Sequence, residues 1–156
     1  MENISTNITY GEATKSQEAA RKGIDNTPDS EQLRSMIIVA HKCFEPLRRF
    51  HNKPIGVSSF FRSIKLNNSI GGSDTSDHCK GKAIDIDADI FNNGMTNLEM
   101  FNWLRDNTDY DQLIKEYPDE SGNPKWVHIS YRSPSKNRKQ VLVAEKIGKR
   151  TIYKVA

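Results

Sequence analysis

A histidine and an aspartate stand seven residues apart in the run SDHCKGKAIDIDAD, residues 76–89, and a second histidine lies farther along the chain. Gly81 separates His78 from Asp85 and favours a turn, so the chain can fold back between them. His128, in WVHIS, can approach from a neighbouring strand. Two imidazoles and a carboxylate are ligands that zinc takes in catalytic sites, which keep a fourth position open. An aspartate beside a histidine also forms structural ion pairs, so the spacing alone leaves both interpretations open.

The other two histidines and both cysteines give weaker signals. His41 lies within a predicted helix and His51 just after it, and we interpret each as a packed or solvated imidazole. Two cysteines are too few for a disulfide framework, so Cys43 and Cys79 are expected to be free thiols in a reducing compartment. Cys79 is next to His78, but neighbouring side chains point apart, and we interpret it as a bystander.

The composition is typical of one folded domain. The chain has 156 residues, of which 35% are hydrophobic and 28% charged, and we expect a single domain over residues 1–156. No apolar run of about 18 residues could span a membrane, and the start MENISTNITYGEATK lacks the basic and apolar regions of a signal peptide. The net charge of +3 comes from scattered Lys and Arg, so we expect no specific nucleic-acid binding. We also expect a monomer.

Residues 27–50 form the clearest predicted helix. Thr27 is the expected N-cap and Pro28 the first helical residue, a position that proline favours. Pro46 is expected to bend the last turn, because proline cannot donate the helical hydrogen bond. Apolar residues recur at spacings of four and three, which predicts one buried stripe. The stripe consists of Leu33, Ile37, Ala40, Phe44 and Leu47.

Short apolar runs with alternating pattern predict a set of strands around a second helix. The predicted strands are 55–61, 82–88, 110–117 and 125–131, followed by a hairpin at 140–155. The second helix, 96–107, begins with a predicted capping box between Thr96 and Glu99. Asp85 and Asp87 share one face of their strand, which needs a functional reason. This order predicts an α+β fold with helices packed on a small antiparallel sheet.

An ordered set of short motifs surrounds the candidate ligands. The pattern Ser-x-His-x-x-Gly-x-Ala-x-Asp is complete at residues 76–85, and Trp-x-His stands at 126–128. Upstream lie Phe-Arg-Ser at 61–63, Leu-Asn at 66–67 and Gly-Gly-Ser at 71–73. Together these motifs resemble the zinc D-Ala-D-Ala carboxypeptidase family, which includes phage endolysin peptidases and shares its fold with hedgehog signalling domains. The strand QLIKE and the polar N-terminal segment are also similar to the phage branch.

The resemblance implies a hedgehog/D-Ala-D-Ala peptidase-like fold, with the polar segment 1–26 packed on the peptidase domain. It also implies a Zn²⁺ site formed by His78, Asp85 and His128. In the family the residue that transfers the proton usually stands three positions before the last histidine, and here that position is Lys125. The sequence departs from the family at this point, so another carboxylate must transfer the proton.

Glu116 is the candidate that we predict for this role. If QLIKEY pairs with KWVHIS so that Tyr117 lies opposite Lys125, then Ile114 lies opposite His128 and Glu116 is diagonal to the histidine on the same face. A shift by one residue would lose that face. The alternatives are Asp119 and Glu120 in the following loop, or a solvated carboxylate at position 116 without a catalytic role.

Two further residues are expected at the site from the resemblance. Arg62 is similar to the family's substrate-binding arginine, whose planar guanidinium suits a bidentate contact with a carboxylate or carbonyl. An arginine at a strand end can also be a surface residue. Ser76 resembles the family serine beside the metal and is expected to support the substrate or a ligand by hydrogen bonding. Gly71, Gly72 and Gly81 are expected where the backbone excludes a side chain.

The function implied is that of a zinc metallopeptidase that hydrolyses amide bonds in peptidoglycan stem peptides. It would act either as a D-Ala-D-Ala carboxypeptidase or as an endolysin-type endopeptidase. The alternative is a non-catalytic peptidoglycan-binding or virion structural module with the same fold, which the lysine at position 125 supports. With no signal peptide, we expect synthesis in the cytoplasm of a phage-infected host and action on the cell wall after release or as part of a virion.

Overall fold

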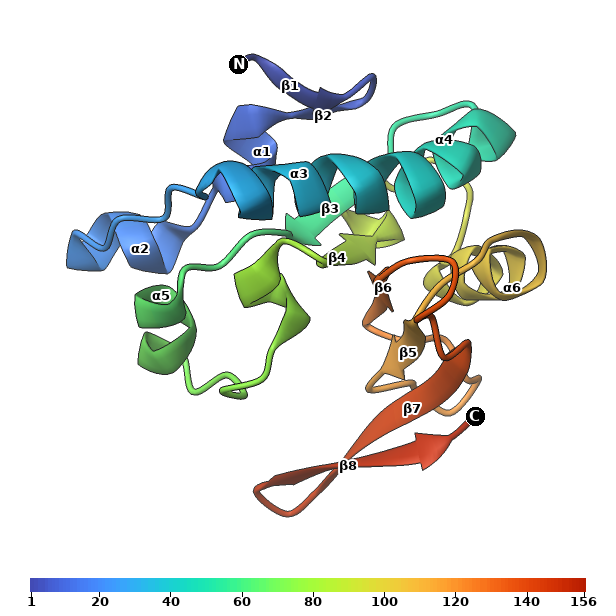
Figure 1. Ribbon diagram of the computed structural model, residues 1–156. Coiled ribbons are helices and arrows are strands. Elements are labelled where there is room, and N and C mark those ends of the chain that lie inside the picture. The colour runs from blue at the N-terminus through green and yellow to red at the C-terminus, as the bar shows by residue number, and fades with distance from the viewer.

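The computed structural model describes residues 1–156 and is built around one six-stranded sheet (Figure 1). Its strands are β3 (Gly56–Ser59), β4 (Ala83–Asp87), β5 (Gln112–Glu116), β6 (Trp126–Ser130), β7 (Gln140–Ile147) and β8 (Arg150–Val155), in the order β3-β4-β6-β5-β7-β8. All neighbours pair antiparallel except β5 and β7, which run parallel. The α+β class is confirmed, and the prediction of a wholly antiparallel sheet is wrong at this pair.

β5 and β7 are parallel because the chain returns to the sheet next to the start of β5. β6 occupies one side of β5, and residues 131–139 lead to the other side. There the N–H of Gln140 donates to the carbonyl of Asp111 (2.9 Å), and the Asp111 carboxylate accepts two bonds from the Arg138 guanidinium (3.0 and 2.8 Å). The start of β7 is thereby held beside the start of β5, so both strands run in the same direction.

The two faces of the sheet have different chemistry, because successive side chains of a strand point to opposite sides. One face is apolar and contributes Ile84, Ile86, Leu113, Val127 and Ile129 to a buried cluster of 23 residues. Helices α3 (Ser30–Val39) and α6 (Asn97–Asn107) contact this sheet and add their apolar side chains to the cluster. The opposite face carries Asp85, His128 and Glu116 at neighbouring positions of β4, β6 and β5.

The long N-terminal helix differs from its prediction at both ends. It starts later, because Asp29 is the N-cap and forms a capping box with Gln32, which leaves Thr27 and Pro28 outside. After α3 the chain continues as a π-helix, η1 (Ala40–Phe44), and then as α4 (Glu45–His51). Pro46 lies in the first turn of α4 rather than bending its last turn. Proline has no backbone N–H, so it cannot donate the hydrogen bond that an α-helix would form to the preceding turn. The wider π-helical turn stands at the point where this bond is missing.

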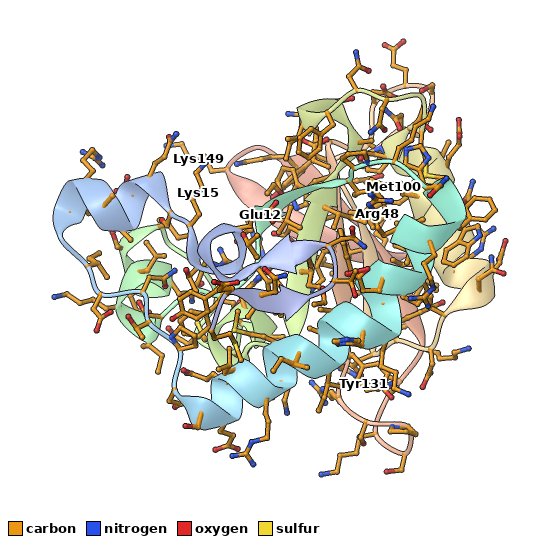
Figure 2. The ribbon with its side chains drawn as sticks, turned by 90° about the horizontal axis from the view of Figure 1, so that it is seen from above. Glu12, Lys15, Arg48, Met100, Tyr131 and Lys149 are labelled. Atoms are coloured by element: carbon orange, nitrogen blue, oxygen red, sulfur yellow. The ribbon has the colours of Figure 1, made fainter.

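The buried side of this helical run is broader than the predicted stripe. Ala40, Phe44 and Leu47 are fully buried as expected, whereas Leu33 and Ile37 lie at the margin of the core. Met36, Val39 and Cys43 complete the buried side. Seen from above, α3 and α4 run along one side of the molecule and the N-terminal ribbon lies over its middle (Figure 2).

The remaining elements are short. They are β1 (Asn3–Ser5), β2 (Ile8–Thr9), α1 (Tyr10–Thr14), α2 (Gln17–Lys22), α5 (Ile64–Ser69) and the 3-10 helices η2 (Asp77–Lys80) and η3 (Ala88–Ile90). The N-terminal ribbon is fixed by Glu45, a buried carboxylate that accepts hydrogen bonds from Ser5 Oγ (2.8 Å) and from the backbone and side chain of Asn7 (2.7 and 2.8 Å). At α6, Thr96 caps the Glu99 N–H as predicted (3.1 Å). No helix has both the length and the apolarity needed to cross a membrane.

Candidate metal centre

His78 is presented by the short helix η2, directly before β4. Ser76 caps this helix by accepting a hydrogen bond from the His78 N–H (3.3 Å), so the serine supports the backbone of the candidate ligand. The imidazole is buried, and its Nδ1 lies 2.6 Å from the carbonyl oxygen of Phe60. Because a carbonyl oxygen can only accept, Nδ1 carries a hydrogen, and in the neutral ring the lone pair is therefore on Nε2. Nε2 lies 3.2 Å from Asp85 Oδ2.

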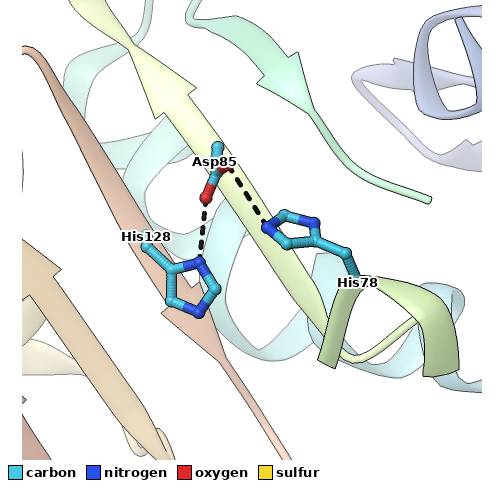
Figure 3. Close-up of side chains that lie close together, drawn as sticks. All are labelled: His78, Asp85 and His128. Atoms are coloured by element: carbon cyan, nitrogen blue, oxygen red, sulfur yellow. Dashed lines mark hydrogen bonds and ion pairs between the residues drawn. The ribbon is translucent and has the colours of Figure 1, made fainter. Parts of the chain in front are cut away.

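Asp85 and His128 face each other across a strand pair. They are directly opposite in the register of β4 and β6, and His128 Nδ1 lies 2.9 Å from Asp85 Oδ1 (Figure 3). The ligand atoms of His78, Asp85 and His128 all lie within 4.8 Å of one another. The structure therefore brings together the three residues that the motifs indicate, from one turn and two strands.

The arrangement fits a zinc ion by two measures. Zn–N and Zn–O bonds of about 2.0–2.1 Å in a tetrahedron place neighbouring ligand atoms about 3.3 Å apart, close to the 2.9 and 3.2 Å found here. In addition, the Phe60 carbonyl engages Nδ1 of His78, which leaves Nε2 free to bind a metal ion beside the Asp85 carboxylate. Burial would raise the pKa of Asp85, but the charge of His78 and the hydrogen bond from His128 outweigh it and hold the pKa well below its usual range.

Helix α3 holds the turn that carries His78. Gly81 follows the turn with φ of 71°, and a Cβ there would lie 2.4 Å from the Gln32 carbonyl oxygen. The Gln32 side chain in turn donates to the Cys79 carbonyl (3.1 Å). Any larger residue at position 81 would push the turn away from the helix, so the glycine of the motif is required by close packing.

Glu116 lies beside the three candidate ligands in the predicted register. Ile114 is opposite His128 and Glu116 is opposite Trp126, so Glu116 is diagonal to the histidine on the same face. Its side chain is buried, with 7% of the residue exposed. Burial raises its pKa to about 7; the Asp85 charge acts in the same direction, while His128 and Arg62 oppose it. A carboxyl group with this pKa can accept and return protons near neutral pH.

Arg62 lies in the extended segment that follows β3, next to the turn that carries His78. Its backbone N–H donates to the His78 carbonyl (3.3 Å), and its Nε is buried without a hydrogen-bond partner. An unsatisfied buried donor is costly in a folded protein. The guanidinium takes part in no ion pair within the chain, and its charge reaches Glu116.

The other carboxylates considered at the sequence level are less suited to proton transfer. Asp119 Oδ1 accepts three hydrogen bonds within its own loop, from the N–H and hydroxyl of Ser121 and the N–H of Asn123, and these lower its pKa. Glu120 is exposed in the same loop. Lys125 is also exposed, and its backbone N–H donates to the Glu116 carbonyl (2.8 Å).

Several residues lie outside the site. His41 bonds to the Ile37 carbonyl within its helix (2.9 Å), His51 bonds to Asn93 (2.7 Å), and both cysteines are free thiols.

The sequence did not predict two residues at the site. The Phe60 carbonyl orients His78, and no sequence signal reports a backbone oxygen. Tyr153, on β8, lies on the face of the site, because Ala144 pairs with both Glu116 and Tyr153; the alternation of the predicted hairpin could have indicated this.

Comparison with known proteins agrees with the geometry. The model of the family described as Peptidase M15 matches residues 6–130, which is more than half of the chain and includes all three candidate ligands. No curated protein matched the chain. The matched region ends before β7, so the C-terminal hairpin lies outside it. The resemblance stated from the motifs is confirmed, and the chain belongs to the peptidase M15 family of zinc peptidases.

Proposed function

We propose that this chain is a zinc metallopeptidase that hydrolyses an amide bond in the peptide stems of bacterial peptidoglycan. The observation that carries the proposal is the convergence of His78, Asp85 and His128 on one point, with a buried carboxyl group beside them. Family membership supports the metallopeptidase class. The hedgehog-like architecture, the wall substrate and a phage setting rest on the motif resemblance and are part of the proposal.

The metal would be held by His78 Nε2, an Asp85 carboxylate oxygen and His128 Nδ1. A bound zinc ion would supply Lewis acidity, which polarises the scissile carbonyl and activates water. The Phe60 carbonyl keeps the Nε2 lone pair of His78 directed at this point. The core on the opposite side of the sheet fixes β4 and β6, so the Asp85–His128 contact is maintained without substrate.

Glu116 would transfer the proton. As a water oxygen attacks the carbonyl carbon, the Glu116 carboxylate accepts a proton from that water. As the C–N bond breaks, it returns the proton to the departing amine nitrogen. The pKa of about 7 makes both transfers favourable near neutral pH. Arg62, whose backbone N–H bonds to His78, would bind a carboxylate or carbonyl oxygen of the substrate through its guanidinium.

A second function is favoured by one observation. Lys125 occupies the position where the family usually has its proton carrier, which supports a non-catalytic module that binds wall peptides. The buried Glu116 argues against it, because a binding module has no need for a carboxyl group kept in an unfavourable environment beside a metal site.

The deciding experiment is digestion of isolated peptidoglycan by the purified zinc-loaded protein, with mass spectrometry of the released fragments. We expect new amine and carboxylate termini within or at the end of the stem peptide, which also identifies the bond cut. The matched control is Glu116→Gln, which keeps the size of the side chain and should release fragments roughly 10²-fold more slowly at unchanged zinc content. A parent protein that binds the wall but releases no fragments would establish the non-catalytic alternative.

A further inference from the structure

A pocket of about 740 Å³ adjoins the candidate site at the end of β5. It is lined by Tyr117, Pro118, Lys125, Trp126, Glu145 and Lys146. Trp126 lies directly opposite Glu116 in the β5–β6 register and shares its strand face with His128, two residues on. Two residues along a strand span about 7 Å. A molecule in this pocket is therefore about one to two peptide residues away from the metal-binding point.

The aromatic side of the pocket is held in place. Tyr117 has a φ of 53°, which is uncommon for a bulky residue and reverses the alternation of β5 at this point. Its hydroxyl bonds to Thr151 Oγ1 on β8 (2.7 Å), and its ring lies edge-on to that of Trp126 with 5.4 Å between centroids. Two fixed rings thus provide an apolar surface beside the charged groups of the pocket.

The charges of the pocket favour an anion. Glu145 is paired with Lys154 (3.0 Å), which neutralises the only acidic group among the lining residues. Lys125 and Lys146 take part in no ion pair and line the same pocket. Two unpaired ammonium groups next to fixed aromatic rings suit a ligand group that has a carboxylate on an apolar stem.

We propose that this pocket is a specificity subsite for a side-chain or α-carboxylate of the peptide substrate, one to two residues from the bond that is cut. The inference rests on the proposed function, since peptidoglycan stems contain acidic residues that some walls carry in amidated form. It assigns a role to Lys125, and it extends the site to β7, which lies outside the region matched by the family.

The test compares two synthetic stem peptides that differ only in a free carboxylate or a carboxamide next to the cleaved bond. We expect the parent to hydrolyse the acidic peptide with a kcat/KM about tenfold higher. The double variant Lys125→Gln/Lys146→Gln should lose this preference, so that the ratio of its kcat/KM values for the acidic and the amidated peptide falls to about one. The control Lys136→Gln/Lys149→Gln removes the same charge from exposed lysines that do not line the pocket and should keep the preference.

A binding measurement separates failure of this inference from failure of the proposed function. The two peptides are titrated into isotope-labelled Glu116→Gln protein and followed by NMR, which needs no turnover. Tighter binding of the acidic peptide, lost in the lysine double variant, supports the subsite even if no hydrolysis is found. Equal affinity for both peptides, or an equal loss in the control variant, overturns it. Signals that shift with a glycerol phosphate polymer but not with the acidic peptide would assign the pocket to another anion and also overturn it.

Discussion

At the scale of single residues, Asp85 is the centre of the candidate site. It contacts both histidines, one through each carboxylate oxygen, and these contacts hold its pKa low although the group is buried. A carboxylate that stays ionised inside a protein needs cations around it. A metal ion bound between the three side chains would add such a charge.

The first prediction concerns metal content. We expect about one zinc ion per chain after dialysis, and loss of most of it in Asp85→Ala and in His128→Ala, because three protein ligands are needed to fix a catalytic zinc. Elemental analysis of the purified proteins measures this. His41→Ala and His51→Ala are the controls and should keep their zinc. Full occupancy in both ligand variants would remove the proposed site.

The second prediction concerns Arg62. Substitution by Lys keeps the charge but loses the planar guanidinium, so kcat/KM should fall about tenfold or more while the melting temperature changes little. Steady-state kinetics on a stem peptide and thermal unfolding measure the two quantities. Arg34→Lys, on the exposed side of α3, serves as the control. An Arg62→Lys enzyme as active as the parent would show that position 62 supplies only charge.

At the scale of elements, Asp111 joins the segment before β7 to the start of β5. Its side chain is fully buried and contacts Arg132 Nε (3.1 Å) as well as Arg138. Both arginines are about 40% exposed, so solvent screens part of the attraction. The carboxylate nevertheless determines how β7 enters the sheet, because it also accepts from the Arg138 backbone N–H (3.0 Å).

The third prediction is that Asp111→Asn lowers the free energy of unfolding by about 1–3 kcal/mol, since it removes the charge and one of the two acceptor oxygens that hold Arg138 and Arg132. Denaturant unfolding measures this. Asp106→Asn, which breaks an exposed pair with Arg105, should change stability little. A loss no greater in Asp111→Asn than in this control would mean that the pair does not hold β7.

The fourth prediction follows from the same group. Hydrogen bonds and charge from Arg138 and Arg132 outweigh burial and lower the pKa of Asp111. Its contribution to stability is therefore complete above the unfolded value, about 3.9, and is lost as the pH falls through the lower folded value. The stability difference between the parent and Asp111→Asn should shrink between pH 5 and the acid limit of folding. A stability difference between parent and variant that stays constant over this pH range would show that the pKa of Asp111 is not lowered by folding.

Local features of the sequence predicted some elements well. The Glu116 prediction was conditional on a β5–β6 register with Ile114 opposite His128, and the structure has this register. The helix start was misplaced because two residues compete as N-cap, and Asp29 has Gln32 at the position that completes a capping box, whereas Thr27 instead bonds to Asp25. The parallel pairing of β7 depends on Asp111 and Arg138, a contact across 27 residues that no local pattern reports.

The site was predictable to the extent that motifs carry it. The spacing of His78, Asp85 and His128 left a structural ion pair open, and the motifs around them indicated the metal site. The Phe60 carbonyl, which orients His78, comes from the backbone, and Tyr153 reaches the same face of the sheet from a distant segment. Such contacts depend on how distant segments pack together, so no local sequence pattern predicts them.

At the scale of the whole molecule, the candidate ligands connect segments that are otherwise separate. His78 lies in the turn below α3, whereas Asp85 and His128 lie in the sheet (Figure 1). An ion held by all three would bind the folded chain and not the unfolded one. Metal binding should therefore stabilise the complete fold.

The fifth prediction is a rise of the melting temperature by roughly 5 °C or more when zinc is added in excess to chelator-treated protein. Thermal unfolding by calorimetry measures this. The Asp85→Ala variant should show no comparable rise. A zinc response of equal size in that variant would place the stabilising ion elsewhere on the molecule.

The parallel pairing of β7 has a consequence for self-association. With β6 on one side and β7 on the other, the strand that carries Glu116 has no free edge. The outer strand on that side is β8, where Arg150 and Lys154 place charges that discourage pairing with another molecule. A chain shortened before β7 would expose the backbone of β5 as a template for intermolecular strand pairing. The C-terminal hairpin thus covers the edge of the strand that lies next to the candidate site, and its removal is expected to promote aggregation there.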